Sequence, residues 1–145
     1  RARQMLRALR TASTTGDAAA ATRAALAPRD EDYDRVFAPE VREAMRAGYA
    51  RLWAAPVALV VRPAQSEILV VAATPRDLAE RTDRGRRFPG GYARIAAHLE
   101  PGVVWHRWKF VEPGELLGMA YDGLVWLADH WAWFPKPWQA LGAGR

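Results

Sequence analysis

A chain of 145 residues is the length of one domain, and a domain of this size buries about 68–70% of the surface that its unfolded chain exposes. It contains no cysteine, which excludes disulfides, thiolate chemistry and cysteine-bound zinc. The net charge of +5 comes from 21 basic and 16 acidic residues, and only Lys109 and Lys136 are lysines. Because so many arginines in an alanine-rich chain are typical of a GC-rich coding sequence, this charge is weak evidence for a nucleic-acid partner.

The pattern of apolar and polar runs predicts one α+β domain over residues 1–145, with a helical part at 1–55 and a mainly sheet part at 56–138. No apolar run approaches the roughly 20 residues that span a bilayer. Residues 1–10 also lack the apolar centre of a signal peptide. We therefore expect a cytoplasmic protein without a membrane partner.

Two helices are predicted at the start of the chain. Met5, Leu6 and Leu9 have helical spacing among arginines, which indicates an amphipathic helix that residues 11–16 interrupt. Asp17 is placed to cap a second helix at 18–26, and Pro28 ends it.

A charged connector follows at 29–34, with Tyr33 and Phe37 as expected anchors against the sheet. Its acidic residues could form a metal site or a solvated loop, and we favour the loop. Pro39 then opens a helix that Pro56 closes, and this helix should lie across the sheet. Its apolar stripe comprises Val41, Ala44, Met45, Gly48, Tyr49, Leu52 and Trp53.

The apolar runs 57–61 and 68–73 are most simply the two strands of a hairpin. The second run is apolar at every position, which predicts burial on both faces. Pro75 begins a short helix that reaches residue 81, and a basic loop at 81–87 follows.

Gly90 and Gly91 precede a helical turn at 93–99. The pair could form a turn that needs positive φ or part of a phosphate cradle. We favour the turn, because a cradle requires a longer glycine pattern directly after a strand.

The last third of the chain predicts antiparallel sheet. Residues 103–112 alternate as in a half-buried strand, and 116–127 form a second extended run. If Asp129 and His130 are the loop residues of the next hairpin, Trp126 lies opposite Trp133. Trp138 follows two prolines that end the sheet, and it either packs back on the domain or stands exposed as an interface anchor.

This order of elements resembles the SnoaL-like or ketosteroid-isomerase-like (nuclear-transport-factor-two-like) cone-fold superfamily. The resemblance rests on the steps Thr15-Gly16-Asp17, Tyr49-Ala50-Arg51-Leu52-Trp53 and Asp122-Gly123-Leu124-Val125-Trp126 leading to Trp131. It implies a strongly curved antiparallel sheet, a cone-shaped half-barrel, with N-terminal helices packed on it over a pocket. The superfamily includes isomerases, cyclases, dehydratases and non-catalytic binding or dimerising domains, so the fold alone does not define the chemistry.

Three residues, Asp122, His106 and Tyr121, are candidates for catalysis. Asp122 on an apolar face would have a raised pKa and could act as a general base, with Tyr121, Tyr92 or His106 as hydrogen-bonding partner. We favour the alternative that Asp122 and Gly123 form a bulge in which the carboxylate caps backbone N–H groups. For His106 we likewise favour a hydrogen-bonded core residue over a catalytic one.

The remaining candidates concern binding. Expected pocket residues are Trp108, Lys109, Tyr92, Trp126 and Tyr49, and expected interface residues are Trp138, Arg86 and Arg87. Lys109 and Arg107 share a face with Trp105, which indicates either a cationic pocket wall or a solvated face. We expect no metal site and no cofactor, because the three histidines lack ligand spacing and cysteine is absent. Neither Ser13 nor Ser66 lies in a nucleophile elbow.

Our leading hypothesis is a non-catalytic pocket or dimerising domain that binds a small organic ligand. The second is an enzyme of the isomerase, cyclase or dehydratase type with Asp122 as base. The third is a protein-interaction module of the accessory or immunity type. Nucleic-acid binding by the arginines beside Phe88 and Tyr92 is the weakest interpretation.

Overall fold

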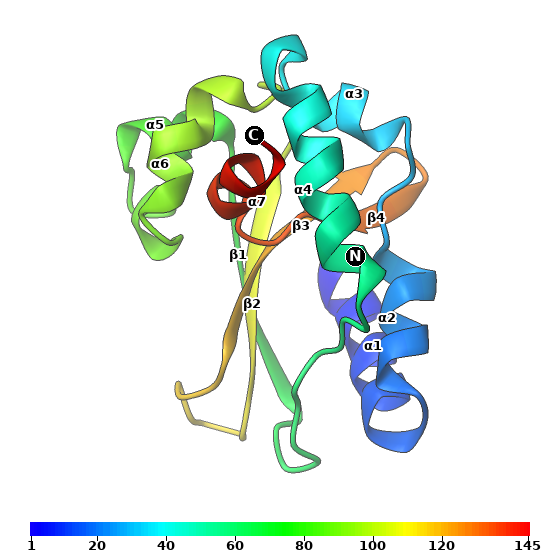
Figure 1. Cartoon of the computed structure of the whole chain (residues 1–145). Coiled ribbons are helices and arrows are strands. Elements are labelled where there is room, and N and C mark those ends of the chain that lie inside the picture. The colour runs from blue at the N-terminus through cyan, green and yellow to red at the C-terminus, as the bar shows by residue number, and fades with distance from the viewer.

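The computed structural model describes residues 1–145, apart from the side chain of Thr15. The described chain contains seven α-helices and four strands, whose arrangement can be followed in Figure 1. The helices are α1 (Ala2–Thr15), α2 (Ala18–Leu26), α3 (Asp32–Val36), α4 (Arg42–Ala54), α5 (Pro75–Glu80), α6 (Gly91–Ile95) and α7 (Pro137–Gly144). The strands are β1 (Glu67–Ala73), β2 (Trp105–Val111), β3 (Ala120–Leu127) and β4 (His130–Trp133). Short 3₁₀ turns lie at η1 (Pro39–Val41), η2 (Gly85–Arg87) and η3 (Ala96–His98).

The four strands form one antiparallel sheet in the order β1-β2-β3-β4, and the sheet is twisted but not closed (Figure 1). α4 packs against α7 in front of the sheet, and α5 and α6 lie beside them. α1 contacts β1 and α2, and α2 contacts β4. The predicted α+β class, with helices packed on an antiparallel sheet, is confirmed.

The N-terminal helix is longer than predicted, because residues 11–15 continue it and only Gly16 lies beyond its end. The hydroxyls of Thr11 and Thr14 donate to the carbonyls of Arg7 and Arg10 one turn earlier, so these threonines fit within the helix. The cap of α2 is confirmed, since the Asp17 carboxylate accepts from the N–H of Ala20 at 3.0 Å. The side chain of Thr15 lies outside the described residues.

The predicted hairpin between 57–61 and 68–73 is wrong. Residues 57–61 form no strand, and β1 pairs instead with β2, from Glu67 opposite Val111 to Ala73 opposite Trp105. The apolar run is also not buried on both faces, because Leu69, Val70, Val71 and Ala72 are only half-buried. β1 is an edge strand, so its run of apolar residues is only partly buried.

The hairpin between β3 and β4 turns one residue earlier than predicted. Ala128, with φ of 61°, and Asp129 are its loop residues, so Trp126 lies opposite Trp131 rather than Trp133. Trp133 lies opposite Leu124.

The C-terminal helix α7 was not predicted, because Pro135 and Pro137 were interpreted only as ends of the sheet. Pro137 occupies the first helical turn, where its missing N–H costs nothing. Trp138 packs on α6, with its ring 5.2 Å from that of Tyr92. A Cβ at Gly91 would overlap this indole. Close packing therefore explains Gly91, and the predicted positive φ at Gly90 and Gly91 is wrong.

Aromatic side chains fill the core between the sheet and α4. The ring of Phe134 meets those of Tyr33, Phe37 and Tyr49 edge-on at 5.2–5.4 Å, which confirms Tyr33 and Phe37 as anchors. The apolar stripe of α4 faces this core, except that Leu52 is 37% exposed.

Candidate functional site

The residues predicted to line a ligand pocket do not share a cavity in the described structure. Tyr49, Tyr92 and Trp108 are at most 1% exposed and belong to the packed core, although Tyr49 also lines a cavity between α4 and α7. Trp126 lies at a shallow groove under α1, and Lys109 lies at a different hollow beside β1. The predicted pocket residues therefore lie in different parts of the molecule.

Asp122 sits at a β-bulge, as we favoured from the sequence. The register between β2 and β3 shifts here, with Arg107 opposite Asp122 and His106 opposite Leu124, so Gly123 is the extra residue. Gly123 has φ of +93°, and a Cβ there would overlap the carbonyl of Phe134. The bulge holds the Asp122 side chain in place at 6% exposure.

The Asp122 carboxylate is occupied by two donors. Tyr92 donates its hydroxyl to Oδ1 at 2.5 Å, and the backbone N–H of Lys136 donates to the same oxygen at 3.0 Å. Burial, with the charge of Asp122 second, raises the pKa of the Tyr92 hydroxyl well above its usual value. A protonated phenol is the donor that a buried carboxylate needs, so this arrangement fixes the chain between β4 and α7.

The other two catalytic candidates have separate partners. His106 donates its Nδ1–H to the carbonyl of Leu124 at 3.0 Å, and burial lowers its pKa. The Tyr121 hydroxyl accepts from the N–H of Val60 at 2.6 Å and ties down the loop at 57–61. No hydrogen bond among the described residues joins either side chain to Asp122.

A second buried carboxylate was missed by sequence reasoning. Asp32 is fully buried, and both its oxygens lie 2.9 Å from Nε2 of His130, while Nδ1 of His130 lies 2.6 Å from Asp129. Burial on its own lowers the pKa of His130, and its hydrogen bonds to Asp32 and Asp129 outweigh that effect, so the pKa is raised. Asp32 and His130 are far apart in sequence, and no spacing signal could have linked them. The pair connects α3 to the start of β4.

The described residues contain no group of three or more His, Cys, Asp or Glu side chains that could hold a metal ion. None of the helices described is both long and apolar enough to cross a membrane.

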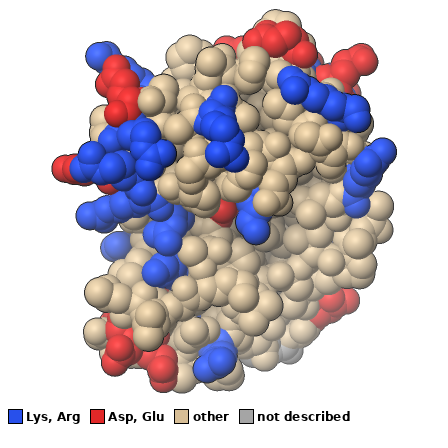
Figure 2. Space-filling view, turned by 60° about the vertical axis from the view of Figure 1, so that its left-hand side comes forward, with Lys and Arg blue, Asp and Glu red and all other residues tan. Residues whose placement is uncertain are grey.

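A basic groove runs along β1, formed by three adjoining hollows. One hollow lies over residues 70–72, one over 66–69, and one on the sheet face between β1 and β2. We define the basic groove by its cationic lining, which is Arg3, Arg7, Arg84, Arg87, Arg107 and Lys109. Figure 2, which brings the α5 and α6 side of the molecule forward, shows Lys and Arg gathered along the left of this face, with acidic side chains at the upper and outer margins of the cluster.

The cations of the basic groove have few acidic partners. Asp83 and Glu67 are the acidic residues that line the groove, and Asp83 pairs with Arg86. None of the five groove arginines forms an ion pair within the described chain, and Lys109 donates to the carbonyl of Leu116 at 3.2 Å. Of the predicted interface residues, Arg87 therefore lies in the groove with its charge free, whereas Arg86 is paired and Trp138 is packed.

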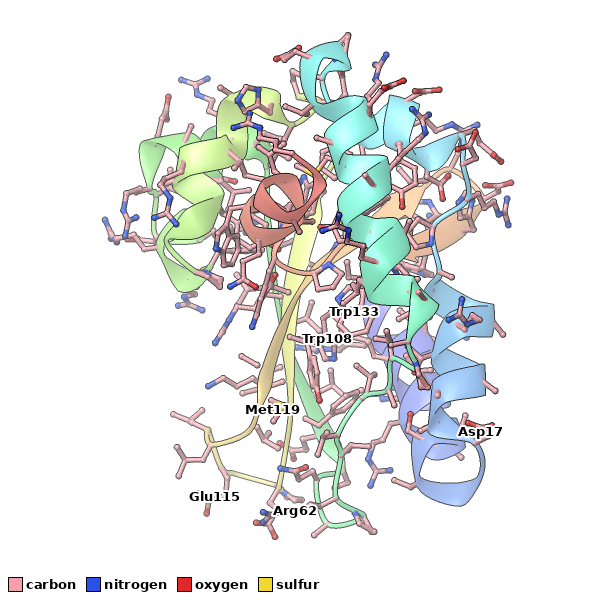
Figure 3. The ribbon with its side chains drawn as sticks, in the orientation of Figure 1. Asp17, Arg62, Trp108, Glu115, Met119 and Trp133 are labelled. Carbon is pink, nitrogen blue, oxygen red and sulfur yellow. The ribbon has the colours of Figure 1, made fainter. Side chains whose placement is uncertain are left out.

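The floor of the basic groove is apolar. Leu69 and Val71 lie directly opposite Lys109 and Arg107 in the register, so all four side chains share one sheet face. Arg107 and Lys109 therefore line a hollow on this sheet face, and their role as the wall of an anion pocket stays a prediction. At the end of the groove Leu116 is 72% exposed, and Leu117 and Met119 continue the exposed apolar loop (Figure 3).

Comparison of the chain with protein-family models, curated proteins and solved structures finds no match. The SnoaL-like resemblance therefore stays a prediction.

Proposed function

We propose that this protein is a non-catalytic interaction module that binds an acidic segment of a partner protein in the basic groove. The observation that carries the proposal is the set of cations along β1 whose charges are not neutralised by the protein itself. Like charges gathered over an apolar floor attract an acidic ligand and raise its rate of association.

The state of the catalytic candidates supports binding over catalysis. A general base must be free to accept a proton from a substrate within hydrogen-bond reach. Asp122 already accepts from Tyr92 and Lys136, and His106 and Tyr121 hold backbone groups. Each of these side chains has a structural task that substrate binding would disrupt.

The lining of the basic groove favours an acidic polypeptide over single-stranded nucleic acid. Proteins that bind single strands stack the bases on exposed aromatic rings. The residues described along this groove are mainly arginines, one lysine, and aliphatic side chains such as Leu69, Val71 and Leu116, and they include no aromatic ring. The acidic residues Glu67 and Asp83 and the polar Ser66 complete the lining. Aliphatic side chains between cations match a peptide that mixes acidic and apolar residues.

A binding measurement with charge-reversed variants tests the proposal. The probe is a fluorescein-labelled peptide of alternating glutamate and valine, and the variant is Arg84→Glu with Arg87→Glu. The matched control is Arg35→Glu with Arg94→Glu, because these arginines are exposed, make no ion pair in the described structure and lie outside the groove. We expect the first variant to weaken binding at least about tenfold and the control to bind like wild type.

Two results would contradict this function. Equal weakening by both double variants would show that the peptide responds only to net charge. Tighter binding of a fluorescein-labelled oligothymidylate than of the peptide, with the same dependence on Arg84 and Arg87, would place nucleic acid in the groove instead.

A cavity between α4 and α7 supports a second candidate function, the binding of a small organic ligand. It has a volume of about 340 Å³, its walls include Leu52 and Ala140, and Arg51 and Lys136 contribute cations. An apolar molecule with a carboxylate matches this lining. Decanoate should bind to wild type in calorimetry and lose affinity when Ala143→Trp fills the cavity, and equal affinity for the two proteins would exclude this site.

A further inference from the structure

The two edge strands of the sheet differ in length and in the residues that border them. β4, at one edge, has four residues, contacts α2, and is tied to α3 through His130 and Asp32. β1, at the other edge, has seven residues, contacts α1 and α5, and pairs only with β2 in the described sheet. Its outer side is bordered by the hollows of the basic groove. A strand with one unpaired side is a template for another strand.

We propose that the acidic segment binds by strand addition, pairing its backbone with the free edge of β1. This inference rests on the proposed function, because it describes how the partner occupies the same groove. Seven residues of β1 extend about 23 Å at the rise of a strand, enough for a short extended peptide. In this mode of recognition, backbone hydrogen bonds supply affinity and alternate side chains supply specificity.

The charges along the edge match such a strand at both ends. Arg3 and Arg7 of α1 border residues 66–69, and Arg84 and Arg87 border residues 70–72. An added strand would therefore meet cations along its whole length, which defines the partner as an extended segment with several Asp or Glu residues.

The sheet face beside the edge defines the rest of the sequence pattern. Leu69 and Val71 are half-buried, so an added strand could cover them further with apolar side chains of its own. Because side chains alternate between the faces of a strand, the partner segment should alternate acidic with β-branched or other apolar residues. Leu116 at the end of the groove offers a contact for one further apolar side chain.

The same charges argue against a second copy of this chain as the occupant. Pairing of two β1 edges would bring the two sets of groove arginines together, in chains that each carry a net charge of +5. Charged side chains on an edge strand keep identical edges apart. The arginines thus repel a second copy and attract an acidic strand.

Backbone methylation of the probe peptide separates strand addition from attraction by charge alone. Two peptides of alternating glutamate and valine, identical in sequence, are methylated on the backbone nitrogens of either the odd or the even positions. In an added strand only alternate N–H groups face the partner strand, so one methylated peptide loses its hydrogen bonds and the other keeps them. We expect one of the two to bind at least about tenfold more weakly than the other.

Hydrogen exchange on the same complex gives a second measurement. With the unmethylated peptide bound, the amides of β1 that face away from β2 should exchange at least about tenfold more slowly. Equal affinity of the two methylated peptides, with unchanged exchange in β1 and a persisting effect of Arg84→Glu with Arg87→Glu, would overturn strand addition while the proposed function stands. Binding that responds to neither methylation nor charge reversal would overturn both.

Discussion

The surroundings of Asp122 and the basic groove along β1 differ in whether their charged and polar side chains have partners within the protein. Around Asp122 the polar groups are hydrogen-bonded to one another, since Tyr92 and Lys136 donate to Oδ1 of the carboxylate and the Trp133 indole donates to the backbone carbonyl of Asp122 at 2.7 Å. In the basic groove, arginines face solvent over half-buried aliphatic residues. The catalytic candidates in the sequence therefore hold the fold together through hydrogen bonds. The groove arginines, which in the sequence indicate only a basic composition, are free to bind a partner.

This difference follows from where each group lies. A buried polar atom without a partner costs about 1–3 kcal/mol, so most buried polar atoms have a hydrogen-bond partner. An exposed arginine remains solvated without a partner, and an exposed ion pair contributes only about 0–1 kcal/mol. Substitutions should therefore cost stability around Asp122 and cost binding along β1.

Asp122→Ala should have the largest effect on stability. The change removes the acceptor of the Tyr92 hydroxyl and of the Lys136 N–H, leaving two donors without partners in a buried site. We expect the free energy of unfolding in urea to fall by about 3–5 kcal/mol. Glu115→Ala, in the exposed loop between β2 and β3 (Figure 3), is the control and should change it by less than about 0.5 kcal/mol. A folded, equally stable Asp122→Ala protein would mean that the carboxylate is free for chemistry.

His130→Ala should have the next largest effect, with a dependence on pH. The pKa of His130 is raised above 6.5 in the folded protein, so the imidazolium contributes its full stability below pH 6.5 and loses it as pH rises through the folded-state pKa. We expect the substitution to cost about 2 kcal/mol at pH 6 and less as the pH increases above 6.5. The measurement is the difference in unfolding free energy between the two proteins, which cancels the titration of His106. A difference that stays constant would show that His130 is neutral in the fold.

Trp133→Phe and Trp108→Phe form a matched pair with a smaller effect. The two rings are buried and pack against each other at 5.7 Å, between the sheet and α4 (Figure 3). The Trp133 indole donates to the carbonyl of Asp122, whereas the Trp108 nitrogen has no hydrogen-bond partner in the described structure. Trp133→Phe should therefore destabilise the protein by about 1 kcal/mol more than Trp108→Phe in urea unfolding. The reverse order would remove Asp122 as the centre of this polar cluster.

Local signals in the sequence predicted the local features of this fold correctly. Asp17 before an alanine-rich run predicted a helix cap, Pro75 predicted the first turn of α5, and Asp122 with Gly123 predicted a bulge. Each depends on neighbours in the chain, because capping and bulging are set by the backbone within a few residues.

Features that depend on distant contacts were not predictable. β1 pairs with β2 across the helices α5 and α6, so the nearer run at 57–61 was the wrong partner. Asp32 meets His130 only after the sheet has formed, and Gly91 is required by the ring of Trp138. The basic groove collects residues from Arg3 to Leu116, and no spacing between them indicates a common surface.

The smallest change in stability is expected for Arg84→Ala with Arg87→Ala. If the groove arginines serve binding and the groups around Asp122 serve stability, removing these arginines should leave stability nearly unchanged. Neither arginine forms an ion pair in the described structure. Hydrogen bonds with Thr74 and Thr82 lower the pKa of Asp77, and the charge of Arg84 adds a smaller effect in the same direction. Removing both charges also reduces the repulsion among the groove cations, which offsets the loss of their aliphatic contacts. We expect the unfolding free energy in urea to change by less than about 0.5 kcal/mol, while affinity for the acidic peptide falls. A loss of stability comparable to that of Asp122→Ala would mean that these arginines hold the fold together, and a surface needed for folding would no longer be available to explain binding.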